Sequence, residues 1–402
     1  MNAKPVDAGH PYMRRALDMF YHEDVQISPN ATSKFVREFA RQLTRHFDVT
    51  LFVYTDGKFV TDSTIDGYRI IRVPRPFISK FGRTPQLKRI FDALSAFSPR
   101  AYFQSMRKNR ADYILVVDSY SGLVTCLMGK VSGKKIIFRP NDCLVTLGAQ
   151  VLKHQSVLMG GIMVCYGLLV ERLLTRVSDL VVMPSKKVLE RFDELYGVGR
   201  KSVVCYYGFK VQPDPLPEDR EHLRRRLGVA DDKFVIIFLG IGGWIPNDLA
   251  ISYIINKLAP TVAGTLPNAL FLIVGRNTEI FRHPTNPTNL RVIGEVPTVE
   301  PYIEASDIGI APLVIGGGVS SKLIDYLWYG LPSLATDEAA GTLEPQKGLY
   351  TTTLADFPKA ILTLSNNKEV LQSRREISSS ARKNYAFDSM VKSVGDKIDD
   401  LL

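Results

Sequence analysis

A short stretch in the second half of the chain combines three glycines with a lysine and an aspartate. Gly316, Gly317 and Gly318 follow an apolar run, and Lys322 lies in the first turn of the helix expected next. Such a loop lets backbone N–H groups approach an anion, while the helix N-terminus and the lysine add positive charge. Asp325 falls on the same helix face as Lys322 and could accept hydrogen bonds from sugar hydroxyls. The pattern predicts a diphosphate site; the alternatives are an ordinary βα turn and a surface ion pair.

Two further turns could contact the same ligand. Gly240, Gly242 and Gly243 follow the apolar run at 234–240, and glycines there allow a ligand close to the backbone. Glu295 stands at the end of another apolar run, where a carboxylate could hold ribose hydroxyls or a base edge. As an ordinary surface glutamate it would need no explanation. The order of these turns along the chain makes a nucleotide site the stronger interpretation.

The elements that must position these residues alternate regularly. Apolar strand-like runs alternate with helical patterns from end to end, which predicts parallel sheets covered on both faces. We expect an α/β fold with two Rossmann-like, doubly wound domains facing a cleft that holds the ligand. A proline-rich, charged segment at 210–229 separates residues 1–212, the first expected domain, from residues 213–384, the expected nucleotide-binding domain. An amphipathic helix at 385–402 should pack back on the first domain.

We expect these strands at 16–21, 47–54, 68–75, 111–119, 134–140, 179–185 and 202–208 in the first domain, and at 234–240, 268–275, 289–296, 308–314 and 331–336 in the second.

Composition favours a soluble, two-domain protein of a reducing compartment. The 402 residues suit two domains, and 45% hydrophobic with 23% charged residues is ordinary for a globular chain. The four cysteines show no CxxC spacing, which argues against a structural zinc site, and no cofactor or metal is expected. The N-terminal residues contain no apolar signal core, so we expect a cytoplasmic protein.

Positive charge is concentrated in the first half. Residues 1–210 carry 32 Lys and Arg against 18 Asp and Glu, whereas residues 211–402 carry 19 against 23. The segment Pro76–Arg110 has eight basic residues, several aromatic residues and Asp92 as its one acid. This mixture suits an anionic membrane surface; the alternative is a helix with a solvated basic face. No nucleic-acid-binding motif accompanies the charge, so we expect no nucleic acid partner.

One apolar segment, Ser156–Val170, is too short to span a bilayer. It contains three glycines and is bounded by charged residues. We expect a buried helix packed closely through its glycines, and no transmembrane helix.

The stretch from Phe234 to Thr336 resembles the nucleotide-sugar-binding domain of GT-B glycosyltransferases of the family-four-like group. Within that group it is most similar to xanthan-type glucuronosyltransferases. The matching residues are the glycine turn with Trp244-Ile245-Pro246-Asn247, Gly294-Glu295-Val296, Ala311-Pro312-Leu313, and Ser321-Lys322 through Gly330-Leu331-Pro332. The resemblance implies that Lys322 contacts the donor diphosphate or sugar and that Glu295 helps to hold the nucleoside.

The chain departs from the retaining members of the group in two places. Many of them carry a Glu-x7-Glu pair, for which this chain has Gly317 and Asp325. They also place a histidine after the strand expected at 134–140, where this chain instead has Arg139 and Asp142 in the pattern R-x-x-D-x-L-x-T. That pattern resembles the loop bearing the general base in the glucuronosyltransferases, so an inverting enzyme is expected. The glucuronosyltransferases have an amide where Asp325 stands, which leaves the donor sugar open between a hexose and a hexuronic acid.

A carboxylate must remove the proton from the acceptor hydroxyl in such a transfer, and Asp142 fits that task. Its alternative role is the N-cap of the following helix. Glu23, Asp24 and Asp118 also stand at strand ends and are the reserve candidates, with Arg139 as a second acceptor-side residue.

The sequence therefore predicts a metal-independent glycosyltransferase at the inner face of the cell membrane. It would move a sugar from a UDP-sugar to a polyprenyl-diphosphate-linked saccharide in exopolysaccharide or cell-envelope synthesis. A retaining transferase, a nucleotide-sugar epimerase and a catalytically silent sugar-nucleotide-binding partner are the alternatives.

Overall fold

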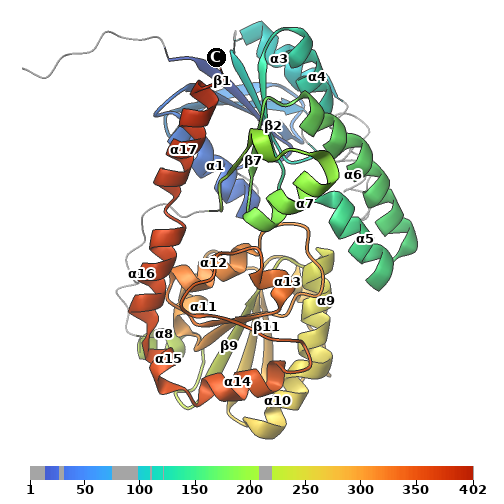
Figure 1. Ribbon diagram of the computed structural model, residues 1–402. Coiled ribbons are helices and arrows are strands. Elements are labelled where there is room, and N and C mark those ends of the chain that lie inside the picture. The colour runs from blue at the N-terminus through green and yellow to red at the C-terminus, as the bar shows by residue number, and fades with distance from the viewer. Residues whose placement is uncertain are drawn as a thin grey trace, which may run out of the picture.

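The computed structural model describes residues 14–26, 31–74, 98–108, 111–120, 122–207 and 220–401. The chain forms two α/β units stacked end to end, each built around its own sheet (Figure 1). The prediction for the segment Pro76–Arg110 falls largely outside the described residues, as does the first half of the expected linker at 210–229.

The N-terminal sheet has eight strands in the order β3-β4-β2-β1-β5-β6-β7-β8. Neighbouring strands are parallel, apart from the antiparallel pair β3 and β4. The strands are β1 (Ala16–Tyr21), β2 (Asp48–Thr55), β3 (Thr61–Ile65), β4 (Tyr68–Pro74), β5 (Tyr113–Val117), β6 (Lys135–Arg139), β7 (Leu180–Met183) and β8 (Ser202–Val204). All seven strands predicted for this half are present, and β3 is additional.

Helices cover both faces of this sheet. Those of the N-terminal unit are α1 (Ala31–Leu43), α3 (Arg100–Lys108), α4 (Leu123–Val131), α5 (Leu144–His154), α6 (Val157–Val177) and α7 (Lys186–Tyr196). Helices α3, α4, α6 and α7 share one core with one face of the sheet, while α1 lies in the core on the other face. The carboxyl ends of the strands are thereby left facing the second unit (Figure 1).

The C-terminal sheet has six strands in the order β11-β10-β9-β12-β13-β14, all parallel. They are β9 (Phe234–Leu239), β10 (Ala269–Val274), β11 (Leu290–Gly294), β12 (Ile308–Ala311), β13 (Ser333–Ala335) and β14 (Leu349–Thr351). The central strands β9, β10 and β12 are buried at every residue, as expected for strands covered on both faces. Five of the six were predicted; β14 is additional.

The helices of this unit are α8 (Arg220–Arg226), α9 (Ile245–Tyr253), α10 (Ala259–Thr265), α11 (Glu300–Ala305), α12 (Ser321–Trp328), α13 (Asp337–Ala340), α14 (Phe357–Ser365), α15 (Lys368–Gln372), α16 (Arg374–Asn384) and α17 (Phe387–Asp399). One π-turn, Ile254–Leu258, joins α9 to α10.

The last helix returns to the first unit. Phe387 of α17 packs its ring 5.4 Å from that of Phe35 in α1, and the Gln42 side-chain amide donates to Asp388 Oδ1 at 2.6 Å. Figure 1 shows α16 and α17 running along one side of both units. The chain thus crosses between the units twice, which limits how far they can separate.

Helix α6 differs from its prediction. It does pack through glycines, since a Cβ on Gly160 would stand 2.4 Å from the Leu152 backbone nitrogen of α5, and one on Gly167 would stand 3.0 Å from that of Val145. Its outer face, however, is exposed, so the helix is not buried. Helix α6 is also long and apolar enough, by length and composition, to cross a membrane. Its inner face carries Glu171 and Leu174 in the core of the first unit, which ties the helix to that fold.

Candidate active site

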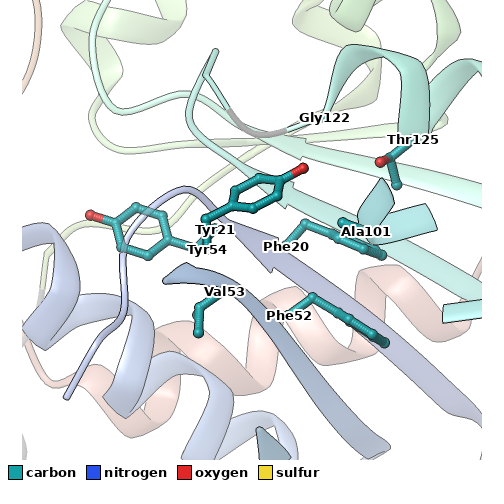
Figure 2. A pocket seen from close by; sticks show the side chains of 8 residues that line it. All are labelled: Phe20, Tyr21, Phe52, Val53, Tyr54, Ala101, Gly122 and Thr125. Atoms are coloured by element: carbon teal, nitrogen blue, oxygen red, sulfur yellow. The ribbon is translucent and has the colours of Figure 1, made fainter. Parts of the chain in front are cut away.

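A cleft of about 790 Å³ lies between the two units. Its walls come from α1 and the β6–α5 loop on one side, and from the loops after β9, β10, β11 and β12 on the other. Figure 2 shows a second hollow, lined by Phe20, Phe52 and Thr125 among others, but its volume of about 10 Å³ holds no more than a water molecule. The cleft is therefore the place for a ligand.

Of the predicted residues, the cleft is lined by Glu23, Asp142, Gly240, Glu295, Gly318, Ser321, Lys322 and Asp325, but not by Asp24, Arg139, Gly242 or Gly243.

Lys322 is the central cation of the C-terminal wall. Its ammonium group donates to Asn247 Oδ1 at 3.1 Å and lies 5.1 Å from the centre of the Phe238 ring. Burial lowers the lysine pKa to about 8, against a smaller opposing effect of Asp325. Because this buried cation has a neutral amide as its partner, an anionic ligand would stabilise its charged form and bind through a charge-assisted hydrogen bond.

Asp325 shares the cleft with Lys322 but does not pair with it. Its carboxylate makes no hydrogen bond or ion pair with any described residue, so the surface ion pair considered above does not form. Burial raises the pKa of Asp325 to about 7. A carboxyl group in this state can either accept from or donate to a sugar hydroxyl.

Two unsatisfied polar groups flank Lys322 and escaped the sequence interpretation. The Ser320 hydroxyl, at the N-cap of α12, and Nε of Arg276, after β10, are buried without a hydrogen-bond partner among the described residues. Both residues line the cleft. Buried polar groups are almost always satisfied, so orphans pointing to a cleft indicate a ligand that completes them. The GRN sequence after β10 was the available signal for Arg276.

The glycine loop has a role that the sequence did not reveal. A Cβ on Gly318 would stand 2.3 Å from the Asn141 carbonyl oxygen, and one on Gly317 would stand 2.9 Å from Cβ of Leu147. Asp142 and Gly318 form an antiparallel bridge, and the Cys143 N–H donates to the Gly317 oxygen at 2.7 Å. These two glycines therefore join the units across the cleft, a packing role that the sequence did not indicate; the approach to a phosphate stays a prediction.

The turn after β9 also uses its glycines for packing. A Cβ on Gly242 would stand 2.2 Å from the Asn277 oxygen, and Gly275 approaches the Gly240 oxygen at a φ of +144°. Gly243, at a φ of +81°, donates its N–H to Asp248 at the start of α9. Of the three predicted glycines, Gly240 lines the cleft, whereas Gly242 and Gly243 shape the turn and do not line it; their role as ligand contacts stays a prediction.

Glu295 is held at the cleft rim by its neighbour Glu279. The Glu295 N–H donates to Glu279 Oε1 at 2.6 Å, and this hydrogen bond lowers the pKa of Glu279. Gly294, at a φ of +94°, permits the close approach. The Glu295 carboxylate is exposed and makes no hydrogen bond with a described residue, so it is available to a ligand.

Asp142 lies on the opposite wall, beside the glycine loop. Burial, and then the negative charge of Asp118, raise the pKa of Asp142 to about 6. Its carboxylate makes no hydrogen bond with a described residue. The N-cap of α5 is Cys143, and the first amide of that helix, on Leu144, donates instead to Glu171 Oε1 at 2.9 Å. The N-cap alternative for Asp142 is therefore wrong, and its carboxylate is free to act as a base near neutral pH.

A histidine missed by the sequence interpretation pairs with Asp118, the residue whose charge raises the pKa of Asp142. His22, at the end of β1, bonds through Nδ1 to Asp118 Oδ2, and its Nε2 lies 3.6 Å from the Glu23 carboxylate. These carboxylates raise the pKa of His22 to about 10 despite its burial. Asp118 has a φ of +68°, a strained conformation for a non-glycine residue and one that is common at functional sites. Asp118 was a reserve candidate from its place at a strand end, but no local motif indicated its pairing with His22, 96 residues away in sequence.

Neither Asp24 nor Arg139 lines the cleft. The Asp24 carboxylate accepts from Arg72 Nε at 2.7 Å, and its role as an acceptor-side residue stays a prediction. Arg139 is fully buried, with its guanidinium 3.7 Å from the Phe35 ring centre, and it donates to Asn141 Oδ1 at 2.8 Å. The Tyr207 hydroxyl donates to the same oxygen, which orients the Asn141 side chain at the cleft wall.

Residues 233–367 match the protein family described as Glycosyl transferases group 1. That span contains β9 to α14 and so includes the loops that form the C-terminal wall of the cleft. None of the curated proteins matches this chain in sequence.

Solved structures are similar along the whole chain. Sucrose-phosphate synthase from Thermosynechococcus elongatus gives a TM-score of 0.72 at 12% identity, covering 96% of this chain and 99% of its own. HepE of Anabaena, solved with UDP and glucose, gives 0.69 at 14% identity, with 96% and 99% covered. WaaG, a glycosyltransferase involved in lipopolysaccharide biosynthesis, gives 0.64 at 12%, with 95% and 98% covered. The chain therefore has the GT-B fold, as predicted.

Proposed function

We propose that this protein is a glycosyltransferase that moves a hexose or hexuronic acid from a UDP-sugar to a lipid-linked saccharide, with inversion at the anomeric carbon. One observation carries the proposal: the cation Lys322 and the carboxylate Asp142 line opposite walls of one cleft. The Asp142 carboxylate has no hydrogen-bond partner among the described residues, and its pKa is raised to about 6. The xanthan-type relationship, the exopolysaccharide or cell-envelope role and the location at the inner membrane face belong to the same proposal.

The donor diphosphate lies at the N-terminus of α12. Lys322 and Nε of Arg276 provide two charge-assisted contacts there, and the Ser320 hydroxyl provides a neutral one. The helix N-terminus adds partial positive charge, so the negative charge that develops on the leaving diphosphate is stabilised. Glu295, exposed at the rim, binds ribose hydroxyls, and Asp325 binds a hydroxyl of the sugar.

The transfer itself is a single displacement. The acceptor hydroxyl gives its proton to the Asp142 carboxylate while its oxygen forms a bond to the anomeric carbon. The bond from that carbon to the diphosphate oxygen breaks, and its electron pair leaves with UDP. The pKa of about 6 lets Asp142 be ionised, yet still basic, at neutral pH.

The support for a lipid-linked acceptor is indirect. The first half of the chain carries the excess of positive charge, and the anionic diphosphate of such an acceptor lies at a membrane surface. The GT-B fold is shared with WaaG, which is described as acting in lipopolysaccharide biosynthesis. A location at the cytoplasmic face of the membrane follows from this reasoning.

Three alternatives give distinct outcomes. A retaining transferase would give a product with the anomeric configuration of the donor, an epimerase would change the donor sugar without transferring it, and a silent partner would bind the nucleotide without turnover. The test is incubation with a panel of radiolabelled UDP-sugars and a crude lipid acceptor, followed by NMR of the product's anomeric proton, with and without a chelator. We expect transfer from one donor, an inverted anomer and no effect of the chelator. Nucleotide binding without transfer from any donor would overturn the proposal.

A further inference from the structure

The outer face of α3, α4 and α6, on the first unit, is apolar and basic. Of the exposed large apolar side chains among the described residues, most are on these three helices: Phe103, Met106, Leu127, Val131, Val157, Leu158, Ile162, Leu168 and Leu169. The three helices pack side by side over one face of the sheet (Figure 1). We call this surface the α3–α4–α6 face.

Helix α6 shows the pattern most clearly. Its exposed residues recur at helical spacing and are apolar along the first three turns, then basic: Leu158, Ile162, Cys165, Leu169, Arg172 and Arg176. Leu158 is 76% exposed and Val157 is 77% exposed. A surface helix normally turns its polar stripe outward; here the outward stripe is apolar, which marks an interaction surface.

The exposed charged side chains on the three helices are basic. Among the described residues they are Arg100, Arg107, Lys130, Arg172 and Arg176, of which Lys130 is paired with Asp179, just after α6. The three helices contain one acidic residue, Glu171, and that residue is fully buried in hydrogen bonds to Leu144, Ser119 and Tyr196. A second copy placed on this face would bring these cations together, whereas an anionic surface would neutralise them.

We propose that the α3–α4–α6 face docks this protein on an anionic lipid leaflet, with α6 lying in the plane of the interface. Apolar side chains enter the boundary between headgroups and acyl chains, and the arginines contact the headgroups. The helix does not cross the bilayer, because its inner face holds Glu171 and Leu174 in the core of the sheet. This inference rests on the proposed lipid-linked acceptor, and it names the surface that delivers that acceptor.

The docked helix is connected to the reacting groups. Helix α5 begins two residues after Asp142 and packs along α6 through the glycine contacts described above. At the other end of the α5–α6 pair, Met159 and Met163 of α6 share a small core with Trp244. Trp244 lines the cleft on the side of the C-terminal unit. Gln150 of α5 accepts the Gly316 N–H at 2.8 Å. Helices α5 and α6 therefore link the docked face to both walls of the cleft.

Cys165 makes the proposal directly testable in the natural sequence. It is the one exposed cysteine of the four, and it stands in the middle of the apolar stripe. An environment-sensitive fluorophore on Cys165 should brighten and shift to the blue when mixed phosphatidylcholine–phosphatidylglycerol vesicles are added, and much less with phosphatidylcholine alone. The matched control is a Cys165→Ser, Ile280→Cys protein labelled at the new thiol. Ile280 is 71% exposed but lies on the other unit, so its label should not respond.

Flotation with the same vesicles supplies the second test. We expect Leu158→Glu with Leu169→Glu to lower the bound fraction at least tenfold, because it removes apolar burial and adds negative charge. Ile280→Glu should bind as the natural protein does. Arg172→Gln with Arg176→Gln should weaken binding to anionic vesicles severalfold and reduce its salt dependence. Thermal melting and UDP affinity should be unchanged in each, since these side chains are exposed and do not line the cleft.

Three results would overturn the inference: no vesicle response at low salt, equal binding by the glutamate variants, or a dimer that these variants dissociate while vesicles are ignored. Failure of the proposed function gives a different result. A protein that binds vesicles through this face but transfers no sugar, even to a water-soluble acceptor, would retain the docking surface and lose the glycosyltransferase assignment.

Discussion

The two walls of the cleft are built in opposite ways. The donor wall consists of local turns: Lys322 and Ser320 stand at one helix start, and Glu295 follows one strand. The acceptor wall depends on contacts between distant parts of the chain, such as His22 with Asp118 and Leu144 with Glu171. Local turns leave a trace in sequence, whereas a network of side chains from different elements does not.

The same difference separates binding from catalysis. The donor wall offers cations and unsatisfied donors, which suit an anionic ligand in its ground state. On the acceptor wall, burial and the negative charge of Asp118 raise the pKa of Asp142, and Asp118 is itself paired with His22. Changes on the donor wall should therefore alter nucleotide affinity, and changes on the acceptor wall should alter turnover. The following experiments test that division.

The largest expected effect is the loss of the base. Asp142→Asn keeps the shape of the side chain but removes its basicity, so we expect turnover to fall by about 10²- to 10⁴-fold. UDP affinity, measured by titration calorimetry, should be unchanged. Asp232→Asn, an exposed substitution before β9, is the matched control and should be silent. A variant that keeps most of its activity would move the base to Glu23 or Asp118.

The second effect concerns the donor wall. Lys322→Ala removes a charge-assisted contact and should weaken UDP binding on the order of tenfold or more. Lys257→Ala changes an exposed lysine of the same unit and should leave binding unaltered. Because burial lowers the pKa of Lys322 to about 8, UDP affinity of the natural protein should also decline as pH rises through that value. Affinity within twofold of the natural protein in Lys322→Ala would contradict the assignment.

The predictability of the molecule follows the same division. Twelve of the strands have apolar runs that a periodicity argument finds, whereas β3, with the sequence TDSTI, is polar and exposed, and β14 has only three residues. The glycines of the Gly316–Gly318 loop were recognised, but their packing against Asp142 requires the second unit in place. Asp24 sits at a strand end like Asp142, and only the position of Arg72 on β4 distinguishes the two.

A third experiment separates the parts of the acceptor wall by pH. Asp142 must be ionised to act as base, so kcat/KM should rise with pH through about 6. The negative charge of Asp118 raises that pKa, hence Asp118→Asn should shift the acid limb to lower pH. Removing the neighbouring cation with His22→Gln leaves Asp118 uncompensated and should shift the limb upward. Limbs that stay at one pH in both variants would show that Asp142 does not produce this ionisation.

The smallest effect should come from the rim of the donor wall. Glu295 is exposed and makes no hydrogen bond with a described residue, so Glu295→Gln removes only the charge of its contact to the ribose, and UDP should bind roughly two- to tenfold more weakly. Glu279→Gln should act in the same direction but less strongly, because Glu279 touches the Glu295 backbone rather than the ligand. The two substitutions act through one turn, so their effects should not add. The test is to measure the affinity for UDP and for inorganic pyrophosphate, which lacks both base and ribose. Both variants should leave the pyrophosphate affinity unchanged. An equal loss for both ligands would place Glu295 at the diphosphate and merge the rim with the Lys322 site.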